Sequence, residues 1–67
     1  MTTARHIAEQ ITDSYTDATQ FEAVSSNGCG EWEHDTAAEL IGAADISVDE
    51  VCDAIVEICK SRLITEN

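Results

Sequence analysis

The chain has 67 residues, of which 43% are hydrophobic, and it carries 14 Asp and Glu residues against 3 Lys and Arg, for a formal net charge of −11. This length supports one domain, spanning 1–67, whose hydrophobic core must be small. The charge excludes direct binding to nucleic acid or to an anionic membrane, because both require cationic side chains, and it favours a basic protein partner instead.

The sequence pattern also excludes a membrane protein and a disulfide-bonded scaffold. No apolar run approaches the roughly 20 residues of a membrane-spanning helix, and there is no basic region followed by an apolar one, as in a secretory signal. The three cysteines cannot all pair within one chain, which fits a reducing compartment. We therefore expect a cytoplasmic protein.

Residues 3–17 are predicted to form an amphipathic helix. Apolar side chains recur there at three- and four-residue spacing, at Ala4, Ile7, Ala8, Ile11 and Tyr15. We expect the N-cap to be Thr2 or Thr3, since a threonine hydroxyl can accept a hydrogen bond from the first helical turn.

The next segment, QFEAVSSNGCGEWEH at 20–34, is predicted to form a β-hairpin. Asn27-Gly28 is the typical pair for a type I′ turn, in which both central residues need positive φ. Pairing the strands about this turn places on the core-facing side Phe21, Ala23, Trp32 and His34. The same register places on the other side Glu22, Val24, Glu31 and Glu33.

Two helices are expected after the hairpin. The first opens with a capping-box pattern from Thr36 to Glu39 and ends near Gly42, and the second opens with another such pattern, from Ser47 to Glu50. The second helix carries an apolar stripe made of Val48, Val51, Cys52, Ile55, Ile58, Cys59 and Leu63. The predicted fold is therefore α+β, in the order helix, β-hairpin, helix, helix, with the hairpin packed on the helices.

The last two predicted helices have the apolar spacing of a helix-turn-helix unit. An ordinary pair of antiparallel helices would fit the same spacing equally well. The second helix presents Asp49, Glu50 and Asp53 where a DNA reader needs cations or amides. We therefore expect a packed helix pair that does not bind DNA.

The acidic residues fall into two rows at i, i+4, i+8 spacing. One is Glu9, Asp13 and Asp17, and the other is Asp49, Asp53 and Glu57. Each row would hold carboxylates about 6 Å apart along a helix axis, with no lysine between them. Neighbouring like charges destabilise a helix, so a repeated, uncompensated row favours a cationic partner over a surface built only for solubility.

Catalytic and metal chemistry find little support in the sequence. The three cysteines and two histidines include no C-x-x-C pair, which zinc sites usually show, so we expect neither metal nor cofactor. His34 lies between Glu33 and Asp35, but a structural histidine is the better interpretation. No nucleophile or phosphate-binding motif is present, and the protein is not expected to be an enzyme.

In length, charge and acidic rows the chain resembles the small acidic anti-CRISPR proteins of phages and mobile elements that mimic DNA. The residues behind this resemblance are Glu9, Asp13, Asp17, Glu22, Glu31, Glu33, Asp49, Glu50, Asp53 and Glu57. The resemblance implies a monomer that binds the basic DNA-binding surface of a Cas effector subunit and blocks target DNA. The alternative is a haloarchaeal helix-turn-helix-like adaptor with no DNA binding of its own, in which the acidity maintains solubility at high salt.

Overall fold

The computed structural model describes residues 3–65, and in that part of the chain it contains four α-helices and no strand. The helices are α1 (Ala4–Asp13), α2 (Ala18–Asn27), α3 (Glu31–Ile41) and α4 (Val48–Thr65). The predicted α+β fold is therefore wrong. The segment expected to form a β-hairpin forms α2 and the first turn of α3 instead.

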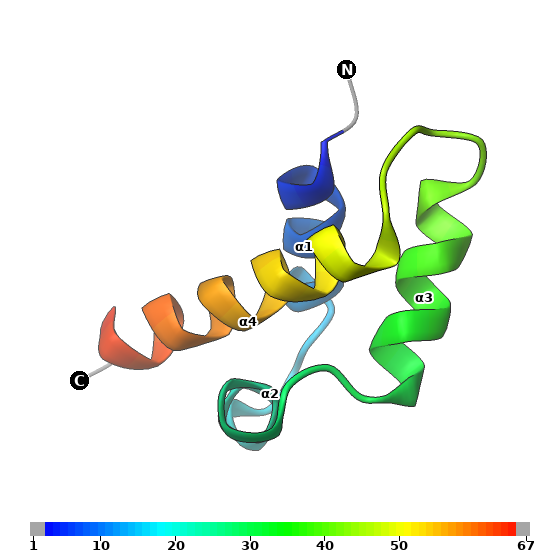
Figure 1. Cartoon of the computed structure of the whole chain (residues 1–67). Helices are drawn as coiled ribbons and strands as arrows, with labels where there is room; N and C mark the ends of the chain where they lie inside the picture. Colours follow the sequence, from blue (N-terminus) through cyan, green and yellow to red (C-terminus); the bar gives the residue numbers. More distant parts are fainter. Residues whose placement is uncertain (1–2, 66–67) are drawn as a thin grey trace.

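Helix α4 is the element on which the others assemble. Figure 1 shows it crossing the middle of the molecule, with α3 steeply inclined to it near its N-terminal end. Each of α1, α2 and α3 packs against α4, and α1 also packs against α3. The long helix therefore supplies one wall of the core to all three shorter helices.

The core confirms the apolar patterns predicted for α1 and α4. The fully or nearly fully buried apolar side chains of the helices are Ile7, Ala8 and Ile11 of α1, Val24 of α2, Ala37 of α3, and Val51, Cys52, Ile55, Ile58 and Cys59 of α4. Tyr15 joins them from the segment between α1 and α2. Only one core side chain comes from each of α2 and α3. Helix α2 packs mainly against α4, whereas α3 packs against both α4 and α1.

Capping interactions explain why α1 and α4 begin where they do. Thr3 is the N-cap of α1, and its hydroxyl accepts a hydrogen bond from the backbone N–H of His6 at 3.1 Å. The Ser47 hydroxyl accepts a hydrogen bond from Glu50 N–H at 3.2 Å, just before α4. Both predicted caps are confirmed.

Helix α2 replaces the first predicted strand because both of its ends are capped. Asp17 accepts a hydrogen bond from Thr19 N–H at 3.0 Å, and Gln20 accepts one from Asp17 N–H at 3.1 Å, which together form a reciprocal capping arrangement. Gly28 ends the helix with a φ of 82°, and its N–H donates to the carbonyl of Val24 at 2.8 Å. The Asn27-Gly28 pair therefore ends a helix, and Asn27 keeps a negative φ.

Helix α3 begins six residues earlier than the predicted helix, with Gly30 as its N-cap, so Thr36 lies inside the helix and is no cap. One carboxylate oxygen of Glu33 accepts a hydrogen bond from Gly30 N–H at 2.8 Å, which closes the first turn. Glu31 and Glu33 also place negative charge in that turn, where the helix dipole favours it. Glu31 and Glu33, which the predicted hairpin placed on one strand, therefore stabilise the first turn of α3.

The burial predicted for Trp32 is also wrong. Its side chain is 52% exposed on α3, and Ala23 and His34, its expected neighbours on the core side of the hairpin, are exposed too. Phe21 alone of that predicted face packs partly against the core. The hairpin register that grouped these residues does not exist in the structure.

Candidate partner-binding surface

The acidic row on α4 is present as one continuous exposed strip. Asp49, Asp53 and Glu57 all lie on this single helix at four-residue spacing, and all three side chains are exposed. Glu50, which lies beside the row, is exposed as well. Between residues 3 and 65 no cation forms an ion pair with any of these four carboxylates. The strip, which we call the α4 acidic row, is therefore available to a partner.

The other predicted row is broken. Glu9 and Asp13 are exposed on α1, but that helix ends at Asp13, and Asp17 caps the start of α2. Asp13 also accepts a hydrogen bond from the Arg62 guanidinium at 2.8 Å, which is an ion pair between α1 and α4. Two of the three carboxylates thus have structural partners, and the row does not exist as one helical face.

The remaining predicted acids do not share one face of a hairpin. Glu22 is exposed on α2, whereas Glu31 is exposed at the start of α3. Glu33 is half-buried and caps the Gly30 N–H. Of the acids predicted to bind a partner, those on α4 keep the arrangement on which the prediction rested.

The few cations do little to offset this charge. Arg5 and Lys60 are exposed, while Arg62 is half-buried with its guanidinium carbon 5.6 Å from the centre of the Phe21 ring. Because Arg62 contacts both Phe21 and Asp13, its charge fixes α4 to α1 and α2. The surface outside this contact stays strongly negative.

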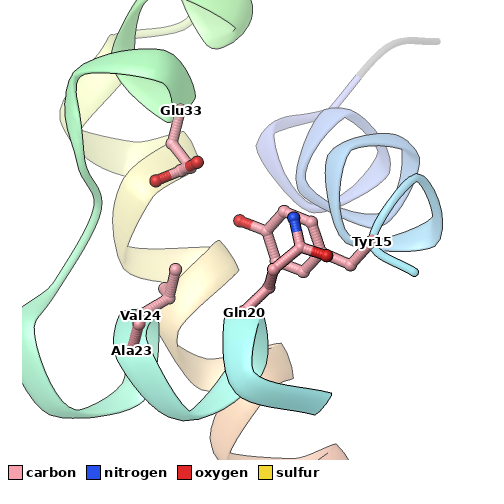
Figure 2. A pocket seen from close by; sticks show the side chains of 5 residues that line it. All are labelled: Tyr15, Gln20, Ala23, Val24 and Glu33. Carbon is pink, nitrogen blue, oxygen red and sulfur yellow. The ribbon is translucent and has the colours of Figure 1, made fainter. Parts of the chain in front are cut away.

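A small pocket of about 160 Å³ opens beside the segment that links α1 to α2. It is lined by Tyr15, Gln20, Ala23, Val24 and Glu33. Figure 2 shows the Tyr15 hydroxyl and the Glu33 carboxylate directed toward the same space, with Ala23 and Val24 on its other side. This pocket is not predicted from the sequence, because it forms only when α2 and the start of α3 are both helical.

Tyr15 is the most unusual group in the pocket. The residue is 9% exposed, and its hydroxyl has no hydrogen-bond partner among the described residues. Burial, followed by the nearby Glu33 charge, raises the pKa of the Tyr15 phenol well above its ordinary value. The phenol is therefore neutral at physiological pH and offers one O–H donor and an acceptor oxygen.

The cysteines and histidines form no chemical site in the part of the chain that the structure describes. Cys52 and Cys59 are buried in the core as predicted, and Cys29 donates a weak hydrogen bond to the Cys52 carbonyl at 3.6 Å. Burial and this contact with Cys52 raise the pKa of the Cys29 thiol to about 12, so it stays protonated and unreactive. Residues 3–65 contain no cluster of three or more side chains able to hold a metal ion.

Comparison with known proteins provides no relative. No family model matches the sequence, and neither a curated protein nor a solved structure is detectably similar to it. No helix within residues 3–65 has both the length and the apolar character needed to cross a membrane.

Proposed function

We propose that this protein binds a basic nucleic-acid-binding protein in the cytoplasm and blocks its nucleic-acid site. The observation that carries the proposal is the α4 acidic row. Its carboxylates are regularly spaced and exposed on one helix, and no cation within residues 3–65 pairs with them. Successive row positions are about 6 Å apart along the axis. This regular line of negative charge resembles the phosphates along a nucleic-acid strand, which a basic groove attracts.

The DNA-binding surface of a type I CRISPR-Cas effector is the target that the resemblance to anti-CRISPR proteins favours. Any groove lined with Lys and Arg would suit this surface, because a helix carrying carboxylates on one side can lie in the groove as a nucleic-acid backbone would. Binding then excludes DNA both by occupying the groove and by repelling phosphates.

The test begins with affinity capture of the target from a bacterial lysate, followed by a competition assay. Labelled duplex DNA bound to the purified target is titrated with this protein, and we expect the duplex to be released. Binding should weaken steeply as salt increases, because exposed ion pairs are screened. Simultaneous binding of DNA and this protein would overturn the proposal.

Charge reversal on α4 locates the interface. We expect Asp49→Lys with Asp53→Lys to weaken binding at least about tenfold, because two attractive contacts become repulsive. The matched control, Asp35→Lys with Glu39→Lys, changes the net charge equally at exposed positions of α3 and should bind more tightly than the α4 variant. Wild-type affinity in the α4 variant would contradict the proposal.

Measuring folding at low ionic strength distinguishes the nucleic-acid mimic from the haloarchaeal adaptor. A protein whose acidity serves solubility at molar salt should unfold at low ionic strength, whereas a nucleic-acid mimic should stay folded there. We expect helical circular dichroism and cooperative melting at low salt. Folding that requires molar salt would instead favour the adaptor interpretation.

A further inference from the structure

The pocket beside Tyr15 combines polar and apolar groups in an arrangement suited to one kind of ligand. The Tyr15 hydroxyl is buried and unpartnered among the described residues, and it faces the same space as the Glu33 carboxylate. A buried hydroxyl without a partner is costly, so a ligand group that hydrogen-bonds to Tyr15 on entering the pocket would bind favourably.

Glu33 can accept a further hydrogen bond. One of its oxygens accepts from Gly30 N–H at 2.8 Å, and no other hydrogen bond within residues 3–65 reaches the carboxylate. The Tyr15 oxygen is a second acceptor on the same pocket. A ligand with several N–H donors and a positive charge satisfies both groups, and the charge of −11 on the whole chain attracts such a cation.

The other pocket walls favour a long side chain over a compact ion. Ala23 and Val24 present apolar surface, against which the methylene groups of an arginine can pack. The guanidinium is planar, carries five donors in a fixed arrangement and is weakly hydrated, so it enters a half-buried site at lower desolvation cost than an ammonium.

We propose that this pocket, lined by Tyr15, Gln20, Ala23, Val24 and Glu33, binds the side chain of an arginine on the partner protein. The inference rests on the proposed function for the source of that arginine, since it identifies an anchor point away from the α4 acidic row. The Glu33 carboxylate pairs with the guanidinium, and the Tyr15 oxygen accepts a second hydrogen bond from it.

The site can be tested without the partner. The probe is N-acetyl-arginine methylamide, titrated into the ¹⁵N-labelled full chain while amide chemical shifts are followed by NMR. We expect saturable shifts centred on residues 15, 23, 24 and 33, with a dissociation constant on the order of millimolar, as for a single small fragment. The corresponding citrulline derivative, which is neutral and similar in shape, should bind much more weakly.

Two substitutions assign the contacts. Glu33→Gln keeps an oxygen for the Gly30 N–H but removes the charge, and it should weaken arginine binding about tenfold. Tyr15→Phe keeps the ring and should weaken binding about threefold. The control Glu39→Gln removes one charge from an exposed position farther along α3, and it should leave the affinity within about twofold of wild type because surface charges act weakly at a distance.

Three outcomes would overturn this site: citrulline or lysine derivatives that bind as well as arginine, unchanged affinity in Glu33→Gln, or shifts centred on α4 in place of the pocket. The test is independent of the competition assay. Probe binding without release of DNA from any target would overturn the proposed function and leave the arginine site in place. Release of DNA without probe binding would do the reverse.

Discussion

At the scale of single residues, Tyr15 is the place where stability and binding oppose each other. Its ring lies 5.1 Å from the Phe21 ring and 6.3 Å from the Trp32 ring, so it helps to hold the α1–α2 linker, α2 and α3 together. Its hydroxyl, by contrast, is buried with no hydrogen-bond partner among the described residues. The ring stabilises the fold while the hydroxyl destabilises it.

Replacing Tyr15 by phenylalanine separates these two effects. Because the ring contacts remain and the unpaired hydroxyl is removed, we expect Tyr15→Phe to raise the free energy of unfolding by about 1 kcal/mol. Urea denaturation followed by circular dichroism measures the change. A lower stability than wild type would show that the hydroxyl makes a favourable interaction in the free protein.

At the scale of secondary structure, the sequence was informative where periodicity extends over a whole helix. In α1 and α4 the apolar side chains repeat over about two or more turns, and caps at Thr3 and Ser47 fix both starts. The predicted end of the third helix near Gly42 is also correct, since Gly42 is its C-cap with a φ of 55°. These features depend on neighbouring residues and are therefore visible in the sequence.

Helix α2 and the start of α3 could not be assigned from the sequence, because α2 and α3 each have only one buried side chain and therefore show no apolar period. A glycine with positive φ is needed both by a type I′ turn and by a helix end, so Asn27-Gly28 fits either structure. The capping pattern from Asp17 to Gln20 is the signal that could have decided between them. The pocket depends on both helices, and so the sequence could not show that Tyr15 and Glu33 line the same pocket.

Substitutions at Asn27 and Gly28 test whether this segment ends a helix or forms a hairpin turn. Gly28 has a φ of 82° and a ψ of −177°, a conformation that is essentially restricted to glycine, and a new methyl group there would meet no neighbour within 4 Å. We therefore expect Gly28→Ala to destabilise the protein by about 1–3 kcal/mol through the backbone alone. Thermal melting would measure the loss.

The control at the neighbouring position is Asn27→Ala. Asn27 is the last residue of α2 and has a negative φ, so alanine can adopt its conformation without strain. The free energy of unfolding should change by less than about 0.5 kcal/mol. A large loss at Asn27 as well would indicate a turn that requires positive φ at both residues and would contradict the helix.

At the scale of the whole molecule, the negative charges differ in what they contribute to the free protein. Asp53 has only like-charged neighbours along the α4 acidic row, whereas Asp13 pairs with Arg62 across α1 and α4. The first carboxylate repels and the second attracts. The spacing of the acids in the sequence does not distinguish Asp53 from Asp13, because it does not show that the end of α1 lies beside Arg62 of α4.

Neutralising each carboxylate separately should therefore give opposite results at low salt. We expect Asp53→Asn to raise the melting temperature, since each like-charged pair at four-residue spacing costs a few tenths of a kcal/mol. Asp13→Asn should lower it slightly, because an exposed ion pair is worth at most about 1 kcal/mol. Both shifts should shrink as salt is added, and equal shifts of the same sign would show that Asp13 gains nothing from Arg62.

The central position of α4 has a consequence for how the chain folds as it is made. The first three helices leave the ribosome before α4, yet each packs on this last helix and the buried apolar side chains of α4 complete the core. A nascent chain that has exposed only α1, α2 and α3 lacks the surface that holds them together. Native structure must therefore wait until residues 48–59 have emerged, so that folding follows synthesis of this domain and does not accompany it.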